Sequence, residues 1–330
     1  MRVFFVILIF YFFMTAAVFA FDILPQAENA IISPENVEVV YVDQYGFPGS
    51  ADGHFYFPKD VCVSSFGNIE TKLGEIFVAD TGNNRIQRID NNGLFVYQFG
   101  KFGSSAGEFN APAGVVVDFN YYIYVSDNEN NRIQKFDIKG NLVSSFGEYG
   151  KQSGDFIYPL GLALSKAGNL YVADSDNDRI QKFDNSGNFI EVIGGFGRGD
   201  GFLDSPSDVA VDQDESIYVL DAGNNRVQKI DQYGRPVFSF GSFGKENGKF
   251  NAPQGVFIDD NYVYVADTGN NRIQLFNKMG QFVLSYGRYG YKQGEFNGPA
   301  GITVSPQGEI YVADTNNQRI VKLKIISSDN

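Results

Sequence analysis

The chain has 330 residues with 37 Gly, 32 Phe and 19 Tyr, but it contains no Trp, one His and one Cys. This composition excludes a zinc site built on several histidines and a disulfide framework. With 26 Lys and Arg against 39 Asp and Glu, the net charge of −13 at pH 7 disfavours nucleic acid as a partner, because such binding relies on clustered basic side chains.

The first 20 residues predict an export signal. Arg2 precedes an apolar run from Val3 to Met14, and small residues follow up to a cleavage point after Ala20. An uncleaved membrane anchor is the alternative, because Val3 to Ala20 are nearly all apolar. In either case we expect a secreted or cell-surface protein, which contacts a membrane only if this segment is retained. Residues 21–36 are read as a linker.

From residue 37 onward the chain is a tandem repeat. The motif Asp-x-x-Asn-x-Arg occurs six times at a spacing of 47 residues, once 46, and Gly-x-Phe-x-x-Pro, or its Leu variant, keeps the same period. A period of this length is typical of solenoids and propellers. The six repeats span about residues 45–93, 97–140, 144–187, 191–234, 238–280 and 284–326.

Each repeat predicts four short strands separated by Gly, Asn and Asp turns. In the second repeat these are 114–118, 123–126, 132–136 and 142–146. Four strands at this period predict a blade of a β-propeller. The fold class is therefore an all-β, six-bladed propeller of antiparallel strands over residues 37–330. The first repeat carries seven extra residues near Gly67 to Gly74, which we place on the face opposite the repeated motifs.

The two ends of the propeller are predicted to meet in one blade. The sixth repeat ends at Leu323 without a fourth strand, which would leave an open edge. Residues 41–58 align without a gap on residues 95–112, where another repeat has its fourth strand. We therefore expect a strand around residues 37–45 to close the last blade.

The sequences of residues 76–90 and 263–277, with their Ile/Val-Tyr/Phe-Val-Ala-Asp-Thr-x-Asn-Asn-Arg-Ile-Gln core, resemble the NHL repeat. The resemblance covers about residues 37–326 and implies a six-bladed propeller. It implies no single function, since NHL propellers serve as binding platforms in RNA-binding ubiquitin ligases, as sensor domains of surface kinases and as lyases.

The repeated Asp, Asn and Arg are predicted to be structural. We expect the Asp to accept amides of the turn that follows it, the Asn to take the left-handed position, and the Arg to pair with the Asp. The structural pairs are Asp80 and Arg85, Asp127 and Arg132, Asp174 and Arg179, Asp221 and Arg226, Asp267 and Arg272, and Asp314 and Arg319. In the loops before each Pro, we expect one aromatic residue to wedge between neighbouring blades: Phe102, Tyr149, Phe196, Phe243 and Tyr289.

Three further polar features are weaker signals. Asp174, Asp176 and Asp178 alternate like the start of a calcium loop, but the expected glycine and distal glutamate are missing. His54 occupies a variable loop position, and Cys62 is predicted to be a small buried hydrophobic residue. The sequence therefore predicts no cofactor and no assigned metal, with calcium as a weak candidate only.

A ligand site is expected where the repeats differ. The positions around the recurrent Pro should surround the mouth of the central channel, on the face that also carries the Asp-x-x-Asn-x-Arg turns. Aspartate replaces glycine there in the first and fourth repeats, on opposite sides of the ring, and large polar or aromatic residues appear nearby. The candidate mouth residues are Phe57, Lys59, Asp60, Tyr158, Asp208 and Gln254.

These features predict an exported, non-catalytic propeller that binds a protein, peptide or glycan. One alternative is a metal-dependent lyase or lactonase-like enzyme, for which Asp60 and Asp208 are the available carboxylates. A second is an RNA-binding propeller of the ubiquitin-ligase type, which conflicts with the acidic charge.

Overall fold

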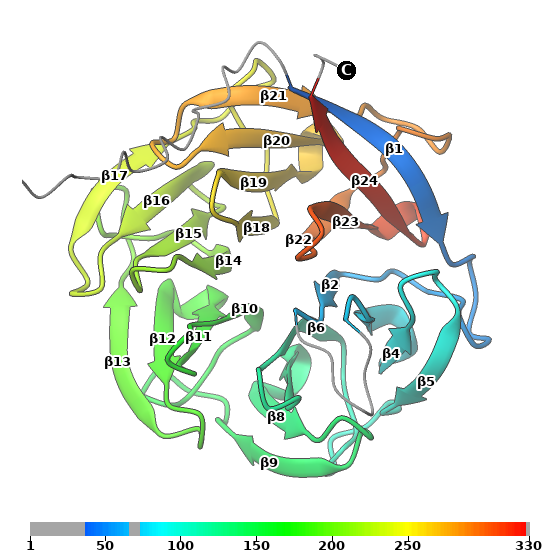
Figure 1. Cartoon of the computed structure of the whole chain (residues 1–330). Coiled ribbons are helices and arrows are strands. Elements are labelled where there is room, and N and C mark those ends of the chain that lie inside the picture. Colours follow the sequence, from blue (N-terminus) through cyan, green and yellow to red (C-terminus); the bar gives the residue numbers. More distant parts are fainter. Residues whose placement is uncertain (1–36, 66–72, 328–330) are drawn as a thin grey trace, which may run out of the picture. The chain divides into compact units, whose positions relative to one another are not determined.

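The computed structural model describes residues 37–65 and 73–327, which belong to one compact unit of residues 34–330. These residues form six four-stranded sheets that stand as blades around a ring (Figure 1). The predicted all-β, six-bladed fold is confirmed. The predicted export signal (1–20), the linker (21–36) and most of the extra segment near Gly67 to Gly74 lie outside the described residues. None of the helices in the described ranges has the length and apolar character needed to span a bilayer.

The strands of each blade follow one another in sequence, from the channel to the outside. Blade 1 contains β2 (Asp60–Val63), β3 (Ile76–Asp80), β4 (Arg85–Ile89) and β5 (Phe95–Phe99). Blade 2 contains β6 (Pro112–Val117), β7 (Ile123–Asp127), β8 (Arg132–Phe136) and β9 (Leu142–Phe146). Blade 3 contains β10 (Pro159–Leu164), β11 (Leu170–Asp174), β12 (Arg179–Phe183) and β13 (Phe189–Gly194).

Blades 4 to 6 repeat this order. Blade 4 contains β14 (Pro206–Val211), β15 (Ile217–Asp221), β16 (Arg226–Ile230) and β17 (Pro236–Phe240). Blade 5 contains β18 (Gly255–Ile258), β19 (Tyr262–Asp267), β20 (Arg272–Asn277) and β21 (Phe282–Tyr286). Blade 6 contains β22 (Pro299–Val304), β23 (Glu309–Asp314), β24 (Arg319–Ser327) and β1 (Val37–Tyr45). Short 3-10 turns follow the second strand in five blades: η2 (Thr81–Asn83), η3 (Asn128–Asn130), η4 (Ser175–Asn177), η5 (Thr268–Asn270) and η6 (Thr315–Asn317).

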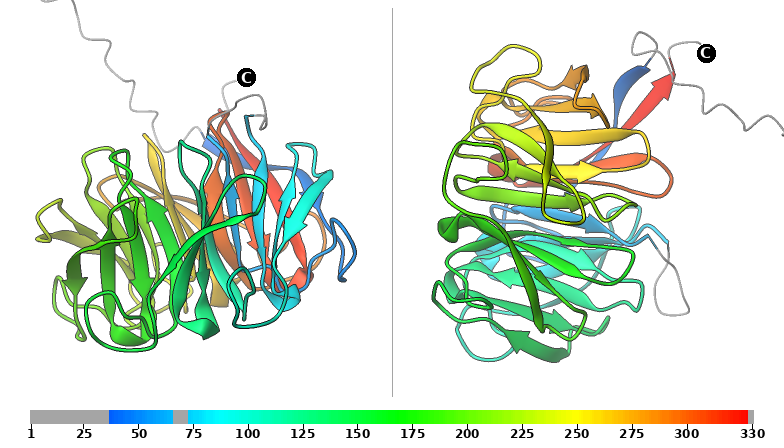
Figure 2. Two further views of the ribbon diagram at one scale, coloured as in Figure 1. Left: turned by 90° about the horizontal axis from the view of Figure 1, so that it is seen from below. Right: turned by 90° about the vertical axis from the view of Figure 1, so that its left-hand side faces the viewer.

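The N-terminal strand closes the ring as predicted. β1 pairs antiparallel with β24 from Val37 opposite Ser327 to Tyr45 opposite Ile320, with an irregularity at Val42. The pairing gives blade 6 its fourth strand, so the exposed edge of β24 is covered. Side views show the strands of the blades running between two faces, where the turns gather (Figure 2).

The hydrophobic core lies between adjacent blades. Val61 and Ile76 of blade 1, for example, cluster with Tyr311 and Ile320 of blade 6. Such residues come from strands with both faces covered, which explains their continuous apolar runs. Five second-strand tyrosines are almost completely buried in these layers: Tyr124, Tyr171, Tyr218, Tyr264 and Tyr311.

We call the segment between the last strand of one blade and the first strand of the next a connecting loop. The six connecting loops are residues 46–59, 100–111, 147–158, 195–205, 241–254 and 287–298. Each begins with a glycine at positive φ, and each contains one fully buried Phe or Leu. At Gly100, for example, a Cβ would lie 2.3 Å from the ring of Phe109, so only glycine allows the ring to pack there.

A buried aspartate ties each connecting loop to the blade that it enters. Asp80 accepts a hydrogen bond from the Tyr56 amide at 2.8 Å through Oδ1, while Oδ2 accepts from Arg85 Nε at 2.7 Å. Arg85 also donates to loop carbonyls, including that of His54 at 2.9 Å. The same Arg–Asp pair occurs in all six blades at 2.6–2.8 Å. The predicted structural pairing of these residues is therefore what the structure shows.

Two details of this predicted turn were wrong. The amide that the Asp accepts belongs to the connecting loop, as with Asn110 N and Asp127 Oδ1 at 2.8 Å, and not to the turn that follows the Asp. The left-handed residue is also one position later than expected, at Asn84 (φ 56) instead of Asn83. The side chain of Asn83 donates from Nδ2 to Asp80 Oδ2 at 2.9 Å.

The prediction that the earlier aromatic residue of a connecting loop packs between neighbouring blades was also wrong. Phe102, Tyr149, Phe196, Phe243 and Tyr289 have side chains that are 70–74% exposed. In each loop the buried position is taken by the later Phe or Leu, such as Phe109, which leaves the earlier ring outside.

The buried Arg–Asp pair predicts a large loss of stability on truncation. In Arg272→Ala, the free energy of unfolding should fall by about 3 kcal/mol, because Asp267 would keep a buried charge without its cation. Arg235→Ala is the matched control, since Arg235 also lies 2.7 Å from an aspartate but is 71% exposed; it should cost less than about 1 kcal/mol. Urea unfolding of both variants measures the difference, and similar losses would contradict the structural role.

The closing strand allows a second test. Val39→Asp places a charge in the core of blade 6, where Val39 is 4% exposed and clusters with Ile302 and Leu323. The variant should lose more than about 2 kcal/mol in free energy of unfolding. Val42→Asp changes an exposed residue at the irregularity of the same strand and should cost less than about 0.5 kcal/mol. Equal thermal midpoints for the two variants would show that β1 does not close the ring.

Candidate functional site

The inner rim of the channel is made where the first strands of the blades come close together. Its six positions, in blade order, are Asp60, Gly114, Gly161, Asp208, Gly255 and Gly301. At Gly114 a Cβ would lie 2.5 Å from the carbonyl oxygen of Leu160, and at Gly255 it would lie 2.2 Å from that of Ala300. Glycine therefore permits adjacent backbones to approach at the rim.

The two aspartates each join three blades. Asp60 accepts the amides of Val61 at 2.8 Å and of Val115, in blade 2, at 2.9 Å. Its Oδ1 also occupies the space next to Gly301 of blade 6, 2.2 Å from where a Cβ would stand. The carboxylate thus fills the space that the neighbouring glycine leaves.

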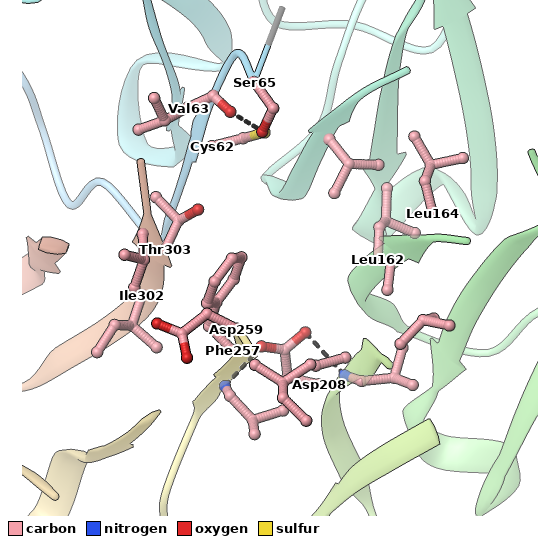
Figure 3. A pocket seen from close by; sticks show the side chains of 18 of the residues that line it. Cys62, Val63, Ser65, Leu162, Leu164, Asp208, Phe257, Asp259, Ile302 and Thr303 are labelled. Atoms are coloured by element: carbon pink, nitrogen blue, oxygen red, sulfur yellow. Dashed lines mark hydrogen bonds between the residues drawn. The ribbon is translucent and has the colours of Figure 1, made fainter. Parts of the chain in front are cut away.

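Asp208 repeats this arrangement on the other side of the ring. It accepts the amides of Val209 and of Val256, in blade 5, both at 2.8 Å. Its Oδ1 lies over Gly161 of blade 3. Figure 3 shows Asp208 with both bonds to backbone nitrogen.

Cavities lie on both sides of this pair of carboxylates. We call the one on the face of the Asp–Arg turns the mouth cavity; its volume is about 370 Å³. The other, the lower chamber, has a volume of about 360 Å³. Asp60 and Asp208 line both, so they lie where the two cavities meet.

The structure brings together five of the six predicted mouth residues. Lys59, Asp60, Tyr158, Asp208 and Gln254 all line the mouth cavity. Ser205 and Ser207 also line the mouth cavity. They flank the recurrent Pro, but they were not among the predicted mouth residues. The remaining lining is mostly glycine and alanine. These small side chains leave the cavity open and contribute few polar groups to it.

Phe57 does not line the cavity. Its ring packs edge-on against Tyr56, with the centroids 4.7 Å apart, and the side chain is 38% exposed. The turn of blade 6 that precedes this connecting loop around the ring also differs from the turns of the other blades. Gln318 stands where other blades have Asn or Asp, and its Oε1 has no hydrogen-bond partner among the described residues.

Tyr158 is held at the mouth in a backbone conformation that non-glycine residues rarely adopt. Its φ is 60°, and its amide donates to Asn131 Oδ1 at 2.9 Å. Asn131 is the left-handed residue of the turn in the preceding blade. The equivalent residues of the other blades also have positive φ, so this conformation belongs to the repeated junction: Phe57, Ala111, Ser205, Ala252 and Gly298.

Burial changes the protonation of the carboxyl groups of Asp60 and Asp208. Burial raises the pKa of Asp60 to about 7. The hydrogen bonds from the two backbone amides lower this pKa, but burial has the larger effect. The pKa of Asp208 is raised well above its ordinary value by burial and by the charge of Asp60. Burial also lowers the pKa of Lys59 at the mouth. The two carboxyls therefore carry fewer than two charges near neutral pH.

The lower chamber was not predicted from the sequence. Part of its wall is apolar, with Leu162 and Leu164 on one side and Ile302 on the other (Figure 3). Its remaining polar lining comes largely from turns between first and second strands: Lys166, Asp212, Gln213, Asp259 and Asp260. Because these turns differ in sequence between repeats, no periodic signal identifies them.

Cys62 also belongs to this chamber. It is partly buried there and packs against the core cluster that contains Phe77 and Val115. Burial raises the pKa of its thiol to about 12, and the nearby Asp60 adds to the shift. The sulfur is therefore a thiol and not a thiolate at physiological pH.

The calcium candidate residues are used differently from one another. Asp174 is buried and accepts from Arg179 Nε at 2.6 Å. Asp178 accepts the Ser205 amide at 2.8 Å, whereas Asp176 is exposed. Within residues 37–65 and 73–327, no three His, Cys, Asp or Glu side chains lie together in a group that could hold a metal ion. Asp60 and Asp208 at the channel have no third ligand of these types in that part of the chain.

Comparison with known families identifies the repeats. The NHL repeat model matches residues 156–183, 203–230 and 296–323, and a model described as a six-bladed β-propeller matches residues 58–146. RING finger protein nhl-1 of Caenorhabditis elegans is 38% identical over 71 residues, which are 22% of this chain and 7% of that protein. The chain thus spans only a small part of this relative.

Several solved structures share the fold. Virginiamycin B lyase from Staphylococcus aureus has a TM-score of 0.57 at 13% identity, over 88% of this chain and 100% of that one. A gluconolactonase from Xanthomonas campestris has a TM-score of 0.61 at 12% identity, over 88% and 98%. An auxiliary nutrient binding protein from Bacteroides ovatus has a TM-score of 0.62 at 14% identity, over 88% and 76%. Identities this low establish the fold alone.

The raised pKa of Asp60 predicts a pH dependence of stability. An unfolded Asp ionises near its ordinary value of 3.8, but the folded one keeps its proton up to about pH 7. Between these values the native state binds more protons, so the contribution of the group to stability falls as the pH rises, by at most about 1.4 kcal/mol per pH unit.

The matching variant is Asp60→Gly with Asp208→Gly, which installs the residue of the other four blades. Urea unfolding from about pH 5 to pH 8 should show the wild-type protein losing stability relative to this variant as the pH rises. A difference that does not change with pH would contradict the assigned pKa direction.

Proposed function

Because this chain is a six-bladed propeller of NHL repeats, we propose that it is an exported, non-catalytic binding module that takes a protein, peptide or glycan ligand at the channel mouth. One observation carries the proposal: the positions at which the repeats disagree line one cavity. The repeated Asp and Arg residues are occupied in holding the ring, whereas Lys59, Tyr158 and Gln254 are available to a ligand.

The size of the mouth cavity limits what enters it. A volume of about 370 Å³ lies near the lower end of small-molecule sites. It is suited to one amino-acid side chain or one sugar ring of a larger ligand, whose remainder would lie over the surrounding loops. Tyr158 and Gln254 would supply the aromatic contact and the amide hydrogen bonds of such a site.

The chemistry of the described residues favours binding over catalysis. A catalytic metal usually has three protein ligands, whereas the channel offers two carboxylates within the described residues. The Cys62 thiol has a pKa raised to about 12 and lies in the lower chamber, away from the mouth lining.

RNA is disfavoured as the ligand. The chain carries a net charge of −13, and this charge would repel phosphate groups. The export signal predicted for residues 1–20 would also place the propeller outside the cytoplasm.

Peptide and glycan arrays test the proposal on the purified full-length protein. We expect the wild-type protein to bind members of one class, and we expect Tyr158→Ala and Gln254→Ala each to weaken that binding by roughly tenfold. Met279→Ala is the control, because Met279 is 70% exposed and lies on the turn after β20, away from the mouth.

Two results would overturn the proposal. One is the absence of any array ligand that the mouth variants weaken. The other is a stoichiometric metal in the purified protein that Asp60→Ala or Asp208→Ala removes, together with lyase or lactonase turnover, which would establish the enzymatic alternative instead.

A further inference from the structure

Five exposed aromatic rings occupy the same position in successive connecting loops. We call Phe102, Tyr149, Phe196, Phe243 and Tyr289 the aromatic rim. In the first loop the equivalent residue is Pro48. The loops lie on the face of the Asp–Arg turns, because Asn130 of one such turn donates to the Gly103 carbonyl at 2.9 Å. Within the described part of the chain, none of the five rings contacts another aromatic ring.

The backbone at each ring is fixed although the side chain is exposed. Around Phe102, the Phe109 amide donates to the Lys101 carbonyl at 2.8 Å, and the Gly103 amide donates to the Phe109 carbonyl at 2.9 Å. Phe109 is itself fully buried. The same pair of bonds occurs at the four other rings. The rings are therefore held on a rigid support, so little loop entropy is lost when a ligand contacts them.

Three of the rings have a carboxylate beside them. Glu108, Asp155 and Glu295 lie over the glycine that follows Phe102, Tyr149 and Tyr289, with an oxygen 2.1–2.3 Å from where a Cβ would stand. Each carboxylate accepts a loop amide at 3.1–3.3 Å, which fixes its orientation. These bonds lower the pKa of Glu108 and Glu295, so both are ionised. A carboxylate has further lone pairs and can accept additional hydrogen bonds from a ligand.

The loops that carry the rings have almost no net charge. They contain seven Lys and Arg and seven Asp and Glu, and several of these are paired, such as Arg288 with Glu295 at 3.0 Å. Such a surface has no net attraction for an anionic lipid surface or a nucleic acid.

From this geometry we infer that the aromatic rim is a second binding surface and that its ligand is an extended, neutral polysaccharide. The C–H face of a sugar ring packs on an aromatic ring, whose electron-rich face attracts the weakly positive hydrogens. The adjacent carboxylates accept hydrogen bonds from sugar hydroxyls. A ligand that repeats can contact several blades at once, and such multivalent contact raises the apparent affinity. This surface is separate from the mouth cavity, whose lining includes none of the five rings.

Affinity gel electrophoresis of the full-length protein tests this inference. The gels contain a soluble neutral polysaccharide: hydroxyethylcellulose, xyloglucan, galactomannan or a β-1,3-glucan. At least one should retard the wild-type protein. Replacing any one aromatic-rim residue with alanine should weaken the interaction roughly three- to tenfold. The five-fold variant, in which all five aromatic-rim residues are alanine, should migrate in the polysaccharide gel as it does in a gel without polysaccharide.

Two control variants show whether a loss of retardation comes from the aromatic rim or from another part of the surface. Tyr233→Ala removes an aromatic side chain that is 71% exposed on the turn between β16 and β17, away from the rim, and should leave the retardation unchanged. The mouth variant Tyr158→Ala should also leave it unchanged, so this inference and the mouth proposal fail independently. The thermal midpoint of the five-fold variant should match that of the wild type, because the rings are exposed.

Three outcomes would overturn the inference. The first is no retardation by any of the four polysaccharides. The second is equal retardation of the wild-type protein and the five-fold variant. The third is binding to phosphatidylserine vesicles or to RNA that the five-fold variant abolishes, since that would assign the rim to a charged partner.

Discussion

The buried Arg–Asp pair of each blade is the interaction on which the rest of the structure depends. Asp127, for example, is fully buried and binds both Arg132 of its own blade and the Asn110 amide of the preceding connecting loop. The loop is thereby fixed on the turn, and everything that the loop carries is fixed with it. Both the residues at the mouth and the exposed rings lie on connecting loops that this bond holds to the blades.

Much of the fold could be predicted because the repeats are compared with one another inside a single chain. The alignment of residues 41–58 with 95–112 located the closing strand, now β1. Contacts formed only in the folded ring were harder to predict. The partner amide of Asp127 comes from Asn110, which is 17 residues away, and no local pattern marks it. Phe102 and Phe109 are both hydrophobic residues of one loop, so composition does not show which of them is buried.

The candidate site was predicted only in part, for a related reason. Positions next to the recurrent Pro share one place in every blade, so differences among them led to Lys59, Asp60, Tyr158, Asp208 and Gln254. The lower chamber is lined by Lys166, Asp212 and Asp259 from turns that differ in sequence between repeats, so the repeat pattern did not predict it. Asp60 and Asp208 also hold the ring together, because each joins three blades. Their chemistry and the integrity of the ring therefore cannot be changed separately.

The closing strand has a consequence for the order of folding. Val37 pairs with Ser327, so the part of the propeller that is synthesised first waits for the part that is synthesised last. Blades 1 to 5 contain only contiguous strands and can form as the chain emerges, but blade 6 cannot be complete before β24 has been synthesised. Long-range pairing of this kind slows folding and leaves strand edges exposed in the meantime. Until β24 arrives, β1 is an unpaired strand that can join another chain.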